Sequence, residues 1–155
     1  YYITSKIVKL LTTSVNPPRT IVLLIQKEVA ERLVATPGDM SILAVSAQIY
    51  ATVRLGEVVP AALFTPPPKV DSQVVILDMH QQPLVDKADE KAFFRMVKAG
   101  FSAKRKKLRS SIASGLHIPK IEAESLLQAA SINPDDRAEQ LSIDDWLRLT
   151  RLANK

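Results

Sequence analysis

The chain has 155 residues and no cysteine, and its 21 Lys and Arg residues against 16 Asp and Glu residues give a net charge of +5. Without cysteine, thiol catalysis, zinc ribbons and iron–sulfur clusters are excluded. The hydrophobic share of 46% is typical of a globular chain, and no apolar run approaches the roughly 20 residues of a membrane helix. We therefore expect one domain or two small ones in a cytoplasmic protein.

The first eighty residues alternate helical and extended patterns. Apolar residues at helical spacing predict a helix over 3–11, and the continuous apolar run 21–25 has the length of a strand. Such a run suits a strand that is covered on both faces, as in a parallel sheet. The following patterns predict two helices and then two strands, over 29–34, 41–51, 52–59 and 73–79.

After a polar linker over 80–90 the pattern is wholly helical. Apolar residues recur every three or four positions over 93–101 and again over 108–112, with a break expected near Gly100. Pro119 suits the first turn of a third helix. A last helix is expected after the capping-box pattern Ser142-Ile143-Asp144-Asp145, and we place Trp146 in its core-facing side. The predicted fold class is α/β followed by all-α.

Positive charge is concentrated in one block. Residues 91–120 contain nine basic residues and no acidic one. Exposed helix faces commonly interleave Glu with Lys, and that compensation is missing here, so the block predicts a polyanion-binding surface. If its densest part is helical, consecutive cations fan around the helix and suit the two walls of an RNA groove. The candidate RNA contacts are Lys104, Arg105, Lys106, Lys107 and Arg109.

A proline-rich segment over 64–72, F-T-P-P-P-K-V-D-S, is the second candidate for function. Three consecutive prolines favour a stiff extended path, which would hold Phe64 in a reproducible position. The alternative is a rigid connector whose Phe64 fills the core. Lys69 and Asp71 are candidates for orienting this loop.

Five segments resemble motifs of the KsgA-type ribosomal RNA adenine dimethyltransferases. The segment 64–72 is similar to that family's F-x-P-x-P-K-V motif, and Arg137-Ala138-Glu139-Gln140-Leu141 is similar to its R-A-E-x-L motif. The others resemble the residues after its N-L-P-Y signature, its Q-K-E-V-x-x-R-L helix and its F-x-x-R-R-K-x-x-R motif, over 1–5, 26–33 and 101–109.

The resemblance implies a fold, an activity and site residues. Residues 1–82 would be the C-terminal half of a Rossmann-like S-adenosylmethionine-dependent methyltransferase sheet, and residues 83–155 a small helical rRNA-binding domain. The enzyme would transfer methyl groups from S-adenosylmethionine to the amino nitrogen of flipped adenines in small-subunit rRNA of the immature small subunit. Tyr1 and Phe64 would hold the two faces of the adenine.

The resemblance also implies that part of the enzyme is missing. The sequence has only four glycines and no G-x-G-x-G loop for the cofactor, and it begins at Tyr1 without an initiator methionine. We expect a C-terminal portion that is inactive alone and that self-associates through the uncovered edge of the strand over 21–25.

Two alternatives stay open. One is a non-catalytic rRNA-binding or ribosome-assembly module, and the other is the related large-subunit rRNA methyltransferase that confers macrolide resistance. The R-A-E-x-L segment and the triple proline favour the small-subunit enzyme. An ion pair of Arg137 and Glu139 that links helices is the favoured interpretation, and RNA contact by these two residues is the alternative. We expect no metal site, because His80 and His117 stand without ligands at metal-binding spacing.

Overall fold

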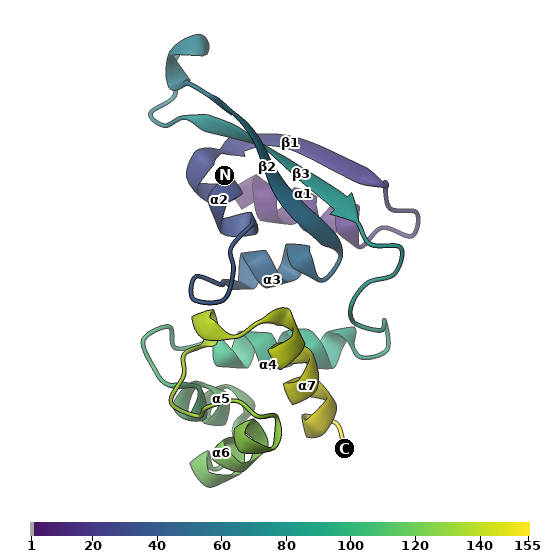
Figure 1. The fold of residues 1–155 in the computed structure, drawn as a ribbon, viewed down its shortest axis with the longest axis vertical. Coiled ribbons are helices and arrows are strands. Elements are labelled where there is room, and N and C mark those ends of the chain that lie inside the picture. Colours follow the sequence, from purple (N-terminus) through teal and green to yellow (C-terminus); the bar gives the residue numbers. More distant parts are fainter. Residues whose placement is uncertain (1) are drawn as a thin grey trace. The chain divides into compact units, whose positions relative to one another are not determined.

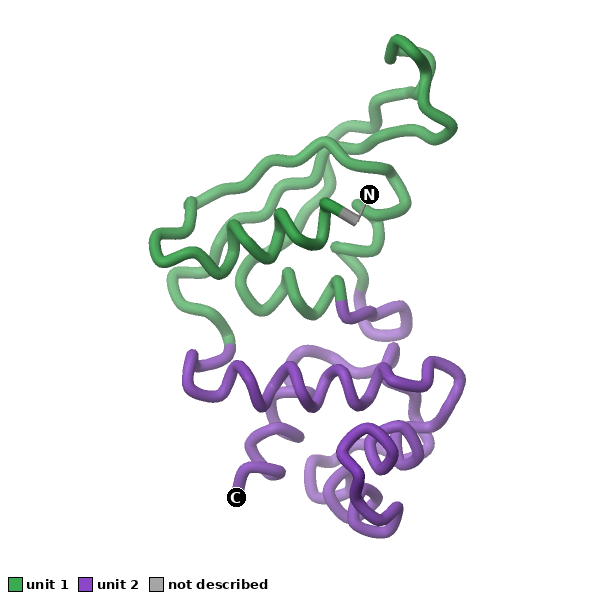
Figure 2. The backbone as a smooth tube through the Cα atoms, turned by 180° about the vertical axis from the view of Figure 1, so that it is seen from behind, with its two compact units in different colours: residues 1–35, 43–84 green, residues 36–42, 85–155 purple. Residues whose placement is uncertain are grey.

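A computed structural model describes residues 2–155, and the side chain of Tyr2 is not described. The chain forms two compact units (Figure 2). The first contains the residues up to 35 together with 43–84, and the second contains 36–42 together with 85–155. Among the described residues, no helix combines the length and apolar character that crossing a membrane requires.

The first unit is a three-stranded antiparallel sheet with helices (Figure 1). The strand order is β1-β3-β2, so β3 is central and runs antiparallel to both neighbours. The strands are β1 (Thr20–Gln26), β2 (Ala51–Val59) and β3 (Ser72–Met79). The helices are α1 (Tyr2–Thr12), α2 (Lys27–Leu33) and α3 (Ile42–Gln48), close to the predicted positions, with α3 ending three residues earlier than expected.

The two faces of β1 differ, which corrects one prediction. Ile21 is buried, whereas Val22 and Leu24 are 63% and 51% exposed. The expectation that this run is covered on both faces within a parallel sheet is therefore wrong for the described chain. All three helices contribute to the core on one side of the sheet only, which is the side of Ile21, Val75 and Leu77.

The second unit consists of helices around Trp146. They are α4 (Glu90–Gly100), α5 (Leu108–Leu116), α6 (Lys120–Ala129), the 3₁₀ helix η2 (Ala138–Gln140) and α7 (Ile143–Ala153). Trp146 is fully buried, as predicted, and its ring lies 5.7 Å from that of Phe101. A Cβ atom on Gly100 would lie 2.3 Å from the Cη2 atom of Trp146, so this position at the end of α4 requires glycine.

The predicted capping box begins α7. The Ser142 hydroxyl oxygen accepts a hydrogen bond from the Asp145 amide at 3.2 Å, and the Asp145 carboxylate accepts one from the Ser142 amide at 2.8 Å. These bonds satisfy amide groups that the helix itself leaves without partners. Pro119, expected in the first turn of α6, lies one residue before it as the N-cap.

Candidate functional site

Phe64 lies directly after the 3₁₀ helix η1 (Ala61–Leu63), which follows β2 and forms the projecting tip of the β2–β3 hairpin (Figure 1). Its amide donates to the Ala61 carbonyl at 3.1 Å, and its backbone is extended. The side chain is partly buried and is not among the buried core residues. This placement disfavours the alternative that Phe64 merely fills the core.

Asp71 holds the loop that carries Phe64. Its carboxylate accepts a hydrogen bond from the Ala61 amide at 2.9 Å, and its backbone carbonyl accepts one from the Lys27 amide at 3.0 Å. The loop is thereby attached to both its own 3₁₀ helix and the start of α2. Asp71 therefore orients the loop, as the sequence suggested, whereas Lys69 is exposed and makes no polar contact among the described residues.

The foot of this loop lies at the end of β1. Ser72, the first residue after Asp71, pairs with Gln26, the last residue of β1. Ile3 and Thr4 of α1 line a pocket with residues near the same end of β1, including Ile25. Tyr1, the expected second ring of the adenine site, lies outside the described residues, so the two-ring arrangement stays a prediction.

The described residues do not form the cofactor loop of a Rossmann-like methyltransferase. Such a loop places glycines between a strand and the following helix. Here β1 ends at Gln26 and α2 begins at Lys27, whose amide already donates to the Asp71 carbonyl. The four glycines lie apart from that junction, at Gly38, Gly56, Gly100 and Gly115. The described residues therefore do not fit S-adenosylmethionine, because they provide no glycine-rich loop to bind it.

The densest cationic segment is a loop, so the helical arrangement considered for it does not form. Lys104, Arg105 and Lys106 lie between α4 and α5, and α5 begins only at Leu108. The Leu108 amide donates to the Asp136 carbonyl at 2.8 Å, and the Arg109 amide donates to the Pro134 carbonyl at 3.2 Å. Backbone from a distant segment thus supplies the partners of this helix start, and the expected fan of cations around one helix does not form.

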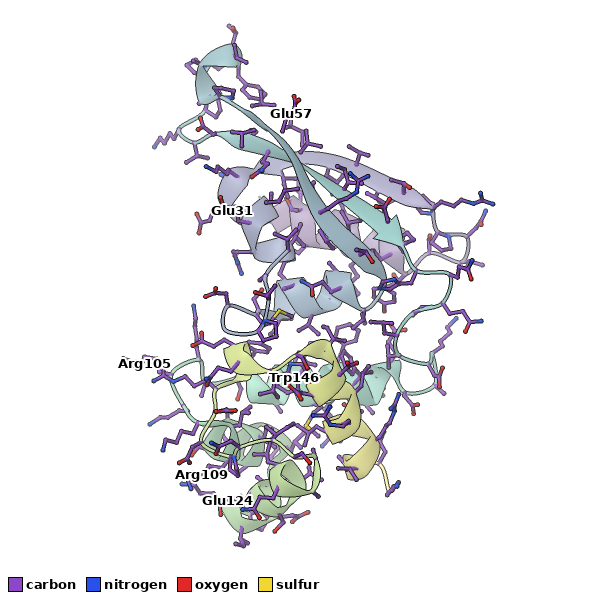
Figure 3. All side chains as sticks on the ribbon, viewed as in Figure 1. Glu31, Glu57, Arg105, Arg109, Glu124 and Trp146 are labelled. Carbon is purple, nitrogen blue, oxygen red and sulfur yellow. The ribbon has the colours of Figure 1, made fainter. Side chains whose placement is uncertain are left out.

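The five candidate cations divide into two groups. Arg109 pairs with Glu124 at 3.1 Å (Figure 3) and also with Asp135. Lys107 pairs with Asp135 at 3.2 Å. We call Lys107 and Arg109 the paired cations. The free-cation loop contains the other three, which are exposed and form no ion pair within the part of the chain that the structure describes: Lys104, Arg105 and Lys106.

The R-A-E-x-L segment acts through its backbone. Neither Arg137 nor Glu139 forms an ion pair among the described residues, so the expected pair between them is wrong. Instead, the Glu139 carbonyl accepts hydrogen bonds from the Gly38 amide at 2.9 Å and the Met40 amide at 3.1 Å. These two bonds attach the segment 36–42 to the second unit.

One group of cations was not singled out from the sequence. Lys91, Arg95 and Lys98 of α4 are exposed and form no ion pair among residues 2–155. Their spacing of four and three residues was the available signal, because it places them on one helix face. Within the same residues, no group of three or more His, Asp or Glu side chains could hold a metal ion.

A partial α/β unit followed by a helical unit is the architecture that this chain shares with Rossmann-like rRNA methyltransferases. The family model for ribosomal RNA adenine dimethylase matches residues 1–155, and the chain belongs to that family.

Relatives with known names support the same class. The chain is 40% identical over 149 residues to ribosomal RNA small subunit methyltransferase A of Dehalococcoides mccartyi (strain CBDB1), covering 96% of this chain and 51% of the relative. It is 43% identical over 158 residues to the protein of that name from Desulfitobacterium hafniense (strain DSM 10664 / DCB-2), covering 100% and 56%. The chain thus spans about half the length of the curated relatives that it matches.

Solved structures agree with the fold. A dimethyladenosine transferase from Plasmodium falciparum matches with a TM-score of 0.79 and 25% identity, over 96% of this chain and 62% of that one. The 23S rRNA methyltransferase ErmE matches with a TM-score of 0.71 and 26% identity, over 100% and 62%.

Proposed function

We propose that this chain takes part in the dimethylation of adenine amino groups in small-subunit rRNA during ribosome assembly. The observation that carries the proposal is the family match over residues 1–155. Relatives at 40% and 43% identity are named as small-subunit enzymes, and among the solved structures the dimethyladenosine transferase matches with a higher TM-score (0.79) than the 23S enzyme (0.71). This difference favours the small-subunit substrate over the large-subunit alternative. A substrate in the ribosome also favours a cytoplasmic location.

Phe64 is proposed to contact one face of the target adenine. Enzymes that modify a base extrude it from its stack, and an aromatic ring can then stack on the extruded base. The attachment of the loop through Asp71 and Ala61 limits the positions that Phe64 can take. Such preorganisation lowers the entropic cost of holding the adenine amino group in line with a methyl donor.

The methyl donor is proposed to be S-adenosylmethionine, which would supply an activated methyl group when bound. The described residues do not fit it, so its main contacts must come from elsewhere in a working enzyme. We expect calorimetry of the 155-residue chain to detect no binding of S-adenosylmethionine. Tight binding of S-adenosylmethionine would contradict our conclusion that the main cofactor contacts lie outside these 155 residues.

The free-cation loop is proposed to contact the phosphates of small-subunit rRNA, in the immature small subunit. Each exposed Lys or Arg that neutralises a phosphate releases a counterion, which makes binding favourable and dependent on salt. Lys104, Arg105 and Lys106 are exposed for this role, whereas the side chains of Lys107 and Arg109 already contact carboxylates.

A chimeric enzyme tests the proposal directly. Residues 1–155 would replace the matching segment of the Dehalococcoides mccartyi relative, and methyl incorporation into unmethylated small-subunit and large-subunit rRNA would be measured. We expect methylation of the small-subunit rRNA only. Phe64→Ala in the chimera should lower the rate by about 5- to 100-fold, as expected for one lost stacking face of about 1–3 kcal/mol.

Leu63→Ala is the matched control for Phe64→Ala. Leu63 is 74% exposed in the adjacent 3₁₀ helix, so its truncation should leave methylation unchanged. A folded chimera that binds small-subunit rRNA but never methylates it would favour the alternative of a non-catalytic assembly module. Full activity of the Phe64→Ala chimera would remove Phe64 from the site.

We also propose that the 155-residue chain self-associates through β1. In the described chain β1 pairs only with β3, so its other edge presents unpaired backbone groups, and Val22 and Leu24 are exposed beside that edge. Light scattering after size-exclusion chromatography should give a mass above 17.1 kDa that falls to the monomer value in the Val22→Lys/Leu24→Lys variant. A monomeric parent chain would contradict this proposal.

A further inference from the structure

One face of α4 carries three cations and an aromatic ring. Lys91, Phe94, Arg95 and Lys98 follow one another at spacings of three, one and three residues, which places them on one side of the helix. Over these positions α4 rises by about 10 Å. We call these four residues the α4 stripe. Its cations are exposed and form no ion pair among the described residues, and Phe94 is partly exposed.

A groove of about 490 Å³ runs along the α4 stripe. All four stripe residues line it, together with Ser102 after α4 and Gly115 of α5. A Cβ atom on Gly115 would lie 2.5 Å from the Cα atom of Ala99, so only glycine lets α5 approach α4 this closely. Among the described residues, no acidic side chain lines this groove.

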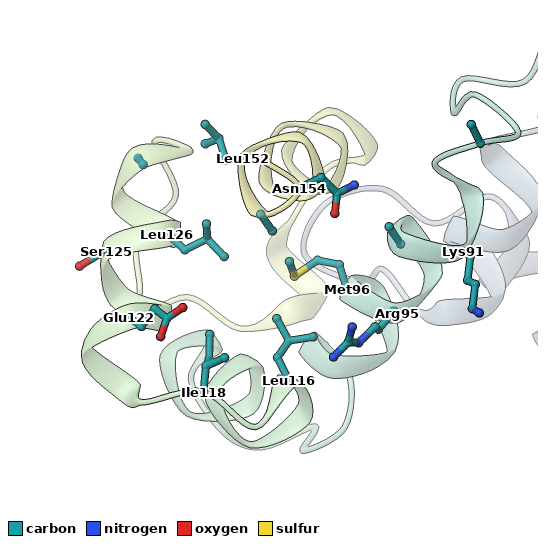
Figure 4. A pocket seen from close by; sticks show the side chains of 14 residues that line it. Lys91, Arg95, Met96, Leu116, Ile118, Glu122, Ser125, Leu126, Leu152 and Asn154 are labelled. Atoms are coloured by element: carbon teal, nitrogen blue, oxygen red, sulfur yellow. The ribbon is translucent and has the colours of Figure 1, made fainter.

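A second pocket, also bordered by the α4 stripe, differs from the groove in charge. Lys91 and Arg95 also border a pocket of about 810 Å³, and Glu122 of α6 lies on its other wall (Figure 4). Apolar side chains such as Met96 and Leu126 line that pocket. A phosphate there would meet a carboxylate and apolar carbon. The acid-free groove is the more favourable path for a polyanion.

The composition of the groove matches a single-stranded nucleic acid. Proteins that bind single strands combine cations that follow the backbone with aromatic rings on which unstacked bases lie. Here the apolar lining consists of one ring, that of Phe94, beside Ala99 and Gly115, and a single ring suits one planar base. An acidic helical peptide would need a broader apolar surface for its own side chains.

We infer that the α4 stripe binds an unpaired stretch of rRNA. Lys91, Arg95 and Lys98 contact successive phosphates, and one base stacks on Phe94. The inference rests on the proposed function, because it takes rRNA as the partner. It adds a second contact region to the free-cation loop, which begins a few residues after Lys98 in the same unit.

Fluorescence anisotropy with a short random-sequence single-stranded RNA tests the inference. The parent chain would be titrated at several salt concentrations beside the Lys91→Gln/Arg95→Gln/Lys98→Gln variant. Three lost phosphate contacts should flatten the slope of log affinity against log salt by about 2 and weaken binding on the order of a hundredfold at 0.1 M salt. The Lys6→Gln/Lys9→Gln/Lys120→Gln variant is the control, because it has the same net charge as the stripe variant. The three lysines that it replaces are exposed and lie outside the stripe.

Phe94→Leu separates stacking from charge. Leucine keeps an apolar side chain of similar size but removes the flat ring, so affinity should fall by about 5- to 100-fold while the salt slope stays at the parent value. A loss of affinity with an unchanged salt slope is expected only if a base stacks on the ring of Phe94. Parent affinity in Phe94→Leu would overturn the assignment of the base.

The other outcomes distinguish this inference from the proposed function. If the stripe variant keeps the slope of the charge-matched control while a Lys104→Gln/Arg105→Gln/Lys106→Gln variant loses rRNA affinity, the inference fails and the proposed function stands. If the parent chain binds neither single-stranded nor structured rRNA, both fail. Loss of binding to a fluorescent poly-glutamate peptide, with RNA binding unchanged, would assign the stripe to an acidic protein and overturn the inference.

Discussion

The free-cation loop and the paired cations are neighbours in sequence and differ in structure. Lys104, Arg105 and Lys106 extend from a loop into solvent without ion-pair partners among the described residues. Arg109, by contrast, is a helical residue whose side chain is 30% exposed and contacts the carboxylates of Glu124 and Asp135. One basic motif therefore serves two purposes, since part of it is available to a ligand and part stabilises the helical unit.

The difference shows why a count of charges overestimates a binding surface. Residues 91–120 contain no acidic residue, yet the structure brings Glu124 and Asp135 from outside that block to pair with two of its cations, Lys107 and Arg109. Only charges without such partners are expected to contribute fully to the salt dependence of RNA binding.

The largest effect expected from this comparison is a loss of RNA affinity in the Lys104→Gln/Arg105→Gln/Lys106→Gln variant. Filter binding to a small-subunit rRNA fragment should weaken on the order of a hundredfold at 0.1 M salt, and the salt slope should flatten by between about 2 and 3. Thermal stability should stay within about 0.5 kcal/mol of the parent, since exposed loop substitutions rarely cost more.

The charge-matched Lys6→Gln/Lys9→Gln/Lys120→Gln variant provides the control for this measurement. It should keep most of the salt slope of the parent chain, because the three lysines that it replaces lie outside both the free-cation loop and the α4 stripe. An equal loss of affinity in both variants would mean that net charge alone attracts the RNA, and the distinction between free and paired cations would lose its functional meaning.

The fold was predictable wherever local pattern decides it. The capping box at Ser142, the burial of Trp146 and the strand over 21–25 all follow from spacing within a few residues, and the structure has each of them. The coverage of β1 was not predictable, because an apolar run does not reveal on which side helices pack. The structure puts the core on the Ile21 side and leaves Val22 exposed.

The residue types of the candidate site were predictable from the sequence, but the conformation of the segments that carry them was not. The motif containing Phe64 marked a stiff loop, and the structure adds the Asp71 hydrogen bond that attaches it. The loop conformation of the cationic segment was not predictable, because the start of α5 involves hydrogen bonds to the carbonyls of Pro134 and Asp136. These carbonyls lie 25 and 28 residues further along the chain than the amides of Arg109 and Leu108, and partners so far apart leave no local sequence pattern.

The second effect concerns stability. Arg109→Leu should lower the free energy of unfolding by about 2 kcal/mol, because Glu124 and Asp135 lose charged hydrogen-bond partners at a partly buried position. For a chain of this size that corresponds to a fall in Tm of about 4–8 °C, measured by circular dichroism. The salt slope of rRNA binding should change much less than in the loop variant.

Arg109→Lys sharpens this prediction. Lysine keeps the charge but cannot contact two carboxylates with a planar fork, so its Tm should fall between those of the parent and Arg109→Leu. If Arg109→Leu instead kept the parent Tm and flattened the salt slope by about 1, Arg109 would belong with the free cations.

The smallest effect is expected for Lys107→Gln, which lies at the boundary between the two groups. Lys107 pairs with Asp135 at 3.2 Å, but both side chains are about half exposed, at 52% and 49%. Exposed pairs contribute roughly 0.2–1 kcal/mol, so Tm should fall by no more than about 4 °C. Because Asp135 already compensates its charge, the salt slope should change by less than the roughly 0.7 expected for a free phosphate contact. A larger change in slope would mean that RNA displaces Asp135 from Lys107, and the free-cation loop would then extend to Lys107, the N-cap of α5.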